Sequence, residues 1–100
     1  RQWRNKMANY NVGETVICSC DVKNDAGTLV NPATSMNITV TQTSPSYTVK
    51  VTSTAMTNDS TGKYHYDCQT SGYQAGNYEV EYIATDGSRI TRYKDTFGLV

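Results

Sequence analysis

The stretch GNYEVEYIATDGSRITRY, residues 76–93, decides the fold class of this chain. Its first half alternates apolar and polar side chains with a period of two, which is typical of a β-strand with one face in a core and one in water. The apolar face consists of Tyr78, Val80, Tyr82 and Ala84. Asp86-Gly87 then supplies a dipeptide favoured in tight hairpin turns, and residues 89–93 provide the returning strand. The stretch therefore predicts an antiparallel β-hairpin.

The same alternation recurs in four further segments of the chain. They are residues 15–22, 35–41, 47–52 and 63–68. Turn-forming residues separate the strands, at 24–27, 31–32, 44–46, 58–62 and 71–77. No window carries the apolar stripe of an amphipathic helix. We expect an all-β fold of about seven antiparallel strands, six from these patterns and one around Trp3–Tyr10.

Length and charge narrow the possibilities further. The 100 residues fit one domain, which we expect at residues 10–100, with residues 1–9 an N-terminal extension or linker, or an edge strand. Met7-Ala8-Asn9 is typical of a translation start, and we expect residues 1–6 to be either an upstream leader or a linker. The net charge is zero, which argues against binding to nucleic acid. The sequence has no apolar run of the length that crosses a membrane, and we expect no membrane partner.

The three cysteines, Cys18, Cys20 and Cys68, form an odd set. At most one internal disulfide can therefore form. The simplest expectation is three buried, reduced thiols that pack as small hydrophobic side chains. Zinc binding has less support, since the Cys18-x-Cys20 spacing differs from the usual gap between two zinc ligands.

No group of residues has the pattern of a catalytic, cofactor-binding or metal site. His65 is the only histidine, and its side chain is expected on the strand face opposite Cys68, which argues against a Cys-His dyad. Glu79 and Glu81 share one strand face, where such residues are more often solvated than paired for acid-base work. Carboxylates and amides in or near loops can bind calcium but are also common turn formers, namely Asp21, Asn24, Asp25, Asp59 and Asp86. We expect neither an enzyme nor a bound cofactor.

Two groups of motifs resemble those of a known family. The first is YNVGETV at residues 10–16, followed by DAG at 25–27. The second is GKYHY at 62–66, followed by GNYEV at 76–80. In this order the motifs resemble the immunoglobulin-like domains of prokaryotic surface proteins, tailed-phage virion proteins and the macroglobulin-like group. The resemblance covers residues 10–84 and implies an antiparallel immunoglobulin-like β-sandwich.

The resemblance also implies roles for single residues. Tyr78 would form a tyrosine corner, in which the hydroxyl bonds a nearby backbone group at the start of strand F. Cys68 would lie on strand E, and Cys18 and Cys20 on strand B. A disulfide from Cys68 to Cys18 or to Cys20, of which we expect the pair Cys20 and Cys68, would then link neighbouring strands of one sheet. The antibody order of Cys, Trp and Cys is missing, because Trp3 precedes every cysteine.

These features favour a non-enzymatic structural or interaction module. The start at Met7, the odd cysteine count and the isolated neutral domain point to a virion component of a tailed phage or related virus, such as a capsid decoration, neck or tail protein, assembled in the host cytoplasm. Its partners would be copies of itself or capsid and tail subunits. The alternative is an extracellular adhesion or ligand-binding domain of a prokaryotic surface protein. Four large side chains near the termini or in a loop are candidate contact residues, namely Trp3, Tyr73, Phe97 and Leu99.

Overall fold

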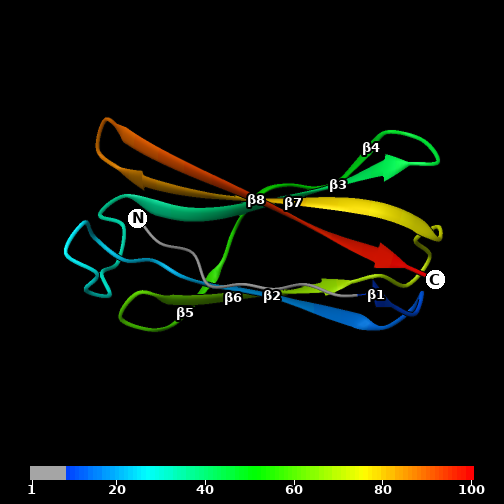
Figure 1. Ribbon diagram of the computed structural model, residues 1–100, viewed down its shortest axis with the longest axis horizontal. Coiled ribbons are helices and arrows are strands. Elements are labelled where there is room, and N and C mark those ends of the chain that lie inside the picture. Colours follow the sequence, from blue (N-terminus) through cyan, green and yellow to red (C-terminus); the bar gives the residue numbers. More distant parts are fainter. Residues whose placement is uncertain (1–8) are drawn as a thin grey trace.

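The computed structural model describes residues 9–100, which form an all-β fold (Figure 1). The strands are β1 (Asn9–Tyr10), β2 (Thr15–Asp21), β3 (Ser35–Ser44), β4 (Thr48–Ala55), β5 (Thr57–Ser60), β6 (Lys63–Gln69), β7 (Gly76–Asp86) and β8 (Arg89–Leu99). They make a five-stranded sheet in the order β1-β8-β7-β3-β4 and a three-stranded sheet in the order β2-β6-β5. Figure 1 shows the two sheets as layers that lie one over the other, as in a sandwich.

One hydrophobic core fills the space between the two sheets. Alternate residues of each core-facing strand point into it, because successive side chains leave a strand on opposite faces. On β7 the buried residues are Tyr78, Val80, Tyr82 and Ala84, none of which has exposed surface. These are the residues that the alternation in the sequence assigns to the core, so that prediction is confirmed.

The hairpin predicted at residues 76–93 is confirmed, and it is longer than expected. β7 and β8 pair over their full length, from Gly76 opposite Leu99 to Asp86 opposite Arg89. The connecting loop is therefore Gly87 and Ser88, one position later than the Asp-Gly pair suggests. Gly87 has a φ of +58°, a value that glycine adopts without a steric penalty.

Strand β5 differs from the sequence prediction, which places a loop at residues 58–62. The segment pairs antiparallel with β6. All four residues of β5 are exposed, so it has no apolar face from which alternation could be recognised. Gly62, with φ of +74°, closes the turn to β6, and a Cβ there would lie 2.8 Å from the carbonyl oxygen of Val22. The described chain thus has eight strands instead of about seven.

The strand predicted around residues 3–10 is represented by β1, which pairs in parallel with β8. Backbone hydrogen bonds continue this pair beyond both strands, from Val100 N to Tyr10 O at 2.9 Å and from Val12 N to Val100 O at 3.2 Å. Residues 1–8, which hold the rest of this prediction and most of the expected N-terminal extension, lie outside the described residues. Within the described range, no helix is long and apolar enough to cross a membrane.

Candidate functional site

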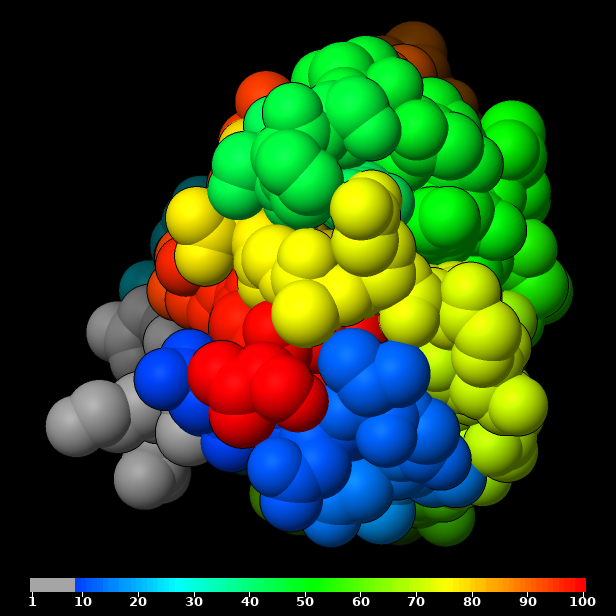
Figure 2. Space-filling view, turned by 90° about the vertical axis from the view of Figure 1, so that its right-hand side faces the viewer, coloured from blue at the N-terminus to red at the C-terminus, as the bar shows by residue number. Residues whose placement is uncertain are grey.

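One end of the sandwich presents exposed apolar side chains on loops that carry almost no charge. We call this surface the neutral end and define it by its three loops, residues 11–14, 43–47 and 70–75. It is the right-hand end in Figure 1, and it faces the viewer in Figure 2. Tyr47 is the most exposed of the large apolar residues described, at 75%. Four of the six exposed large apolar side chains of the described residues lie on the neutral end or adjoin it, namely Val12, Tyr47, Val49 and Val100.

The charges of the molecule lie mostly away from the neutral end. Glu14 is the only charged residue of the three loops, and its Oε1 accepts a hydrogen bond from Asn11 N at 2.6 Å, which closes the first loop. The opposite end carries Lys23, Asp25, Asp86 and Arg89. Loops that are poor in charge and contain Tyr, Ser, Gly and Asn have the composition of protein-binding surfaces.

Thr70 joins the first and third loops of the neutral end. Its side chain is completely buried. The Oγ1 atom accepts a hydrogen bond from Gly13 N at 3.0 Å and donates one to Glu14 O at 2.5 Å. Tyr73 N donates to Thr70 O at 2.9 Å and closes the third loop. Because the hydroxyl both donates and accepts, its loss would leave two partly buried backbone groups unpaired.

Tyr78 and Gln42 join the third loop to the second. Tyr78 Oη donates to the carbonyl oxygen of Gln74 at 2.6 Å, which confirms the hydrogen bond expected of a tyrosine corner. Gln42 Nε2 donates to Gln74 Oε1 at 3.0 Å and to Ser44 O at 3.2 Å. The sequence prediction missed Gln42, which is 2% exposed. The sequence did contain a sign of this role, because Gln42 is a polar residue at the next position of the alternating apolar face of β3.

A column of aromatic rings lies beneath the neutral end. Phe97 stacks on Tyr78 with ring centres 5.2 Å apart, and Tyr78 stacks on Tyr73 at 5.8 Å. Tyr10 meets Phe97 edge-on at 6.1 Å, and Lys50 Nζ lies 5.1 Å from the centre of the Tyr73 ring. Each aromatic pair contributes about 0.5–1.5 kcal/mol beyond the burial of its area. The column ties four strands to the third loop, so we expect the neutral end to be rigid.

The predicted contact residues occupy different places in the fold. Tyr73 lies on the neutral end, where its ring is partly buried in the aromatic column. Phe97 and Leu99 are only 4% and 2% exposed, so their prediction as contact residues is wrong. The physical reason is that β8 continues to Leu99 and turns both side chains into the core. Trp3 lies outside the described residues.

All three cysteines are buried and free, and the disulfide predicted between Cys20 and Cys68 is not formed. The register of β2 and β6 places Cys68 opposite Val16 and Cys20 opposite Tyr64. The two cysteines are therefore about 13 Å apart along the ladder at roughly 3.3 Å per residue, too far for a bridge. Burial raises the pKa of both Cys18 and Cys20 to about 12, and it raises that of Cys68 as well. A raised pKa makes a thiol a poor nucleophile at neutral pH.

His65 and the two candidate glutamates contact other ionisable side chains at the surface. His65 Nδ1 lies 2.7 Å from Asp59 Oδ1, and its Nε2 lies 3.9 Å from Asp67 Oδ1. The two glutamates of β7 pair with cations of β8, as Glu81–Arg92 at 3.1 Å and Glu79–Lys94 at 3.7 Å. Among residues 9–100, no three His, Cys, Asp or Glu side chains gather at one point. Of the residues considered for calcium, Asn24, Asp25 and Asp86 line one pocket.

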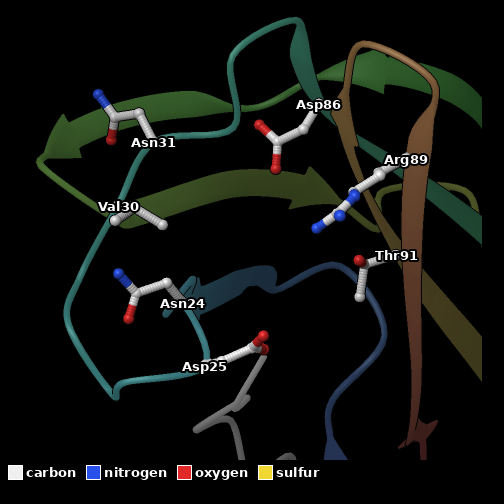
Figure 3. A pocket seen from close by; sticks show the side chains of 7 residues that line it. All are labelled: Asn24, Asp25, Val30, Asn31, Asp86, Arg89 and Thr91. Atoms are coloured by element: carbon white, nitrogen blue, oxygen red, sulfur yellow. The ribbon is translucent and has the colours of Figure 1, made fainter.

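A polar pocket of about 410 Å³ opens at the charged end (Figure 3). It is lined by Asn24, Asp25, Val30, Asn31, Asp86, Arg89 and Thr91. The side-chain amide oxygens of its two asparagines accept hydrogen bonds from the surrounding backbone. Asn24 Oδ1 accepts from two backbone N–H groups of its own loop, each at 3.0 Å, and Asn31 Oδ1 accepts from Gly62 N at 2.7 Å. Figure 3 shows Arg89 reaching from β8 into the pocket, near Asp86. Charges of both signs in one open pocket favour no single class of ligand.

No protein-family model, curated protein or solved structure matches this chain. A functional proposal therefore depends on the neutral end, the strand order and the state of the ionisable side chains.

Proposed function

We propose that this chain is a non-enzymatic structural or interaction module that docks onto other protein subunits through its neutral end. One observation carries the proposal: three loops, joined by hydrogen bonds of Thr70, Gln42 and Tyr78, present partly apolar side chains to solvent with Glu14 as their single charged residue. Loops that are already held together lose little conformational entropy on binding. Side chains such as Tyr47 offer contact area without the cost of desolvating a charge.

We further propose that the sandwich is immunoglobulin-like. In the lettering of that family, β2, β6 and β5 would be strands B, E and D, and β8, β7, β3 and β4 would be strands G, F, C and C′. This assignment puts Tyr78 at the start of strand F and Cys68 on strand E, in agreement with the sequence resemblance.

Within this class we propose a virion component, such as a capsid decoration, neck or tail protein of a tailed phage or related virus. Three free thiols support it, because such particles assemble in a reducing cytoplasm. The alternative is an adhesion or ligand-binding domain of a prokaryotic surface protein. A sugar-binding form of that alternative would need several exposed rings on one face, whereas Tyr47 is the only aromatic among the exposed large apolar residues within 9–100.

Co-sedimentation with particles isolated from the source tests the proposal. Tyr47→Ala removes the most exposed ring of the neutral end, and Ile90→Ala is the matched control, because Ile90 is 58% exposed at the opposite end. A central aromatic contact is worth about 2 kcal/mol, so Tyr47→Ala should bind more than tenfold more weakly, while Ile90→Ala binds as the wild type does. Equal binding of all three proteins, or a wild-type domain without affinity for the particle, would contradict the proposal.

The gene distinguishes the two settings. A reading frame that starts at Met7 among genes for particle proteins supports the virion component. A long frame that encodes several domains supports the surface protein instead.

A further inference from the structure

His65 lies between two carboxylates on the outer face of the three-stranded sheet. Its Nδ1 is 2.7 Å from Asp59 Oδ1 and 2.9 Å from Asp59 Oδ2, whereas its Nε2 lies 3.9 Å from Asp67 Oδ1. An ionised carboxylate only accepts hydrogen bonds, so Asp59 places the proton of a neutral imidazole on Nδ1. The lone pair is then on Nε2, the nitrogen on the side of Asp67.

The pairing of β5 with β6 builds this arrangement. His65 and Asp67 are two positions apart on β6, so their side chains leave the strand on the same face. Asp59 is the residue of β5 that the register shift between Asn58 and Ser60 leaves without a partner on β6. A bulge of this kind re-aims a side chain, and here the carboxylate of Asp59 reaches His65.

The surroundings of Nε2 suit a metal cation. The two carboxylates are negative, and the nearby cation Lys63 is already paired with Asp21 at 3.3 Å. A histidine that ligates a metal through one nitrogen commonly donates its other N–H to a carboxylate, which orients the ring and makes it a better ligand. Tetrahedral zinc holds its nitrogen and oxygen ligands about 3.4 Å apart, so Nε2 and Asp67 Oδ1 need to approach by only about 0.5 Å. The side chain of Asp67 is 53% exposed and has room to make this movement.

We propose that His65 Nε2 and Asp67 Oδ1 bind a zinc ion, with Asp59 as the residue that orients the imidazole. This site is on a different surface from the neutral end, and it is independent of the proposed docking. The two carboxylates lie at opposite nitrogens of the ring, and within residues 9–100 no third ionisable ligand joins Nε2 and Asp67, so water completes the coordination. An imidazole ligand suits zinc and disfavours magnesium, which prefers oxygen ligands in an octahedron.

Titration of the full chain with zinc chloride tests the proposal, because His65 is the single histidine and its imidazole NMR signals report on one place. We expect these signals to shift with a dissociation constant below about 1 mM, and magnesium chloride at the same concentration to leave them unchanged. Removal of an orienting carboxylate costs about 10–100-fold in metal affinity, which we expect for Asp59→Ala, and Asp67→Asn should weaken zinc binding further. Glu79→Gln is the matched control, because it removes a carboxylate from a strand of the other sheet, and it should bind zinc as the wild type does.

The nitrogen shifts of the imidazole separate orientation of the ring from stability of the fold. In mildly alkaline buffer the wild type should carry the ring proton on Nδ1, and Asp59→Ala should show a mixture of the two tautomers. Circular dichroism verifies that the variants keep the wild-type fold. Signals of His65 that do not change up to about 1 mM zinc would overturn the proposal, as would equal weakening by Asp67→Asn and Glu79→Gln. Wild-type zinc affinity in Asp59→Ala would contradict the orienting role of Asp59.

Discussion

Replacing Tyr78 with phenylalanine removes the hydroxyl of the tyrosine corner and leaves the ring in place. The ring stays stacked between Tyr73 and Phe97, at 5.8 Å and 5.2 Å, so the substitution leaves almost no cavity. What is lost is the hydrogen bond to the carbonyl oxygen of Gln74, at 2.6 Å. Because this bond holds the third loop of the neutral end, Tyr78→Phe tests stability and loop order together.

We expect the free energy of unfolding to fall by about 1 kcal/mol in Tyr78→Phe. A hydrogen bond within a protein contributes roughly 0.5–1.5 kcal/mol net. The bond to Gln74 is only partly buried, so water can hydrogen-bond to the carbonyl oxygen in the variant. The loss of stability should therefore stay below the roughly 3 kcal/mol that an unpaired, fully buried group costs. For a domain of this size, the melting temperature should drop by roughly 4–8 °C. Urea denaturation followed by circular dichroism measures the change, and the m-value should stay the same.

Tyr47→Phe is the matched control, because its ring is 75% exposed and its hydroxyl can reach water. We expect its unfolding midpoint to equal that of the wild type. Amide hydrogen exchange adds a local measurement, since Tyr73 N donates to Thr70 O at 2.9 Å and should exchange faster only in Tyr78→Phe. Identical midpoints for both variants, with Tyr73 exchanging at the wild-type rate, would refute the idea that the tyrosine corner holds the loop.

Two further predictions concern buried ionisable groups. Burial raises the pKa of Cys18 and of Cys20 from 9.0 to about 12. Between these two pH values only the unfolded chain releases the thiol protons, so the free energy of unfolding falls as the pH rises. The stability that burial of the neutral thiols provides is therefore complete below pH 9.0 and is lost as the pH approaches 12. The free energy of unfolding from urea titrations should fall by about 1.4 kcal/mol per pH unit for each thiol, and an unchanged slope in Cys18→Val would count against this account. Asp95 Oδ2 is buried with no hydrogen-bond partner among residues 9–100, so Asp95→Asn should stabilise the fold by about 1 kcal/mol at neutral pH. A lower melting temperature for Asp95→Asn would mean that the carboxylate is favourably placed.

Alternation in the sequence was sufficient for strands that bury one face. It located β2, β3, β6 and β7, because the core imposes a period of two on each of them. It also located β4 from residues 47–52, although Tyr47 and Val49 on the apolar side of that segment are exposed. β5 is exposed on both faces, so it has the composition of a loop, and only its pairing with β6 makes it a strand. β8 extends past Tyr93 to Leu99, and Asp95 concealed this extension by interrupting the apolar face.

The candidate surface could be predicted only in part, because it depends on how distant strands are arranged. Tyr73 was recognisable as an aromatic residue in a polar loop. The gathering of Val12 and Tyr47 at one end follows from the strand order of two sheets, which no single segment encodes. The prediction of a disulfide between Cys20 and Cys68 was wrong for a related reason. Alternation gives the strand face on which each residue lies, but it does not give the register between neighbouring strands.

A pulling force along the chain would enter this domain through β1 and β8. These two strands run in the same direction, so tension would act at opposite ends of the pair and slide one strand along the other. The load would then fall at the same time on two hydrogen bonds and one ring contact. These are the bonds from Val100 N to Tyr10 O and from Val12 N to Val100 O, and the contact between Tyr10 and Phe97. A hairpin pulled at its open end, in contrast, loses its bonds one after another. The parallel pair therefore makes this sandwich resist extension until several bonds fail at once.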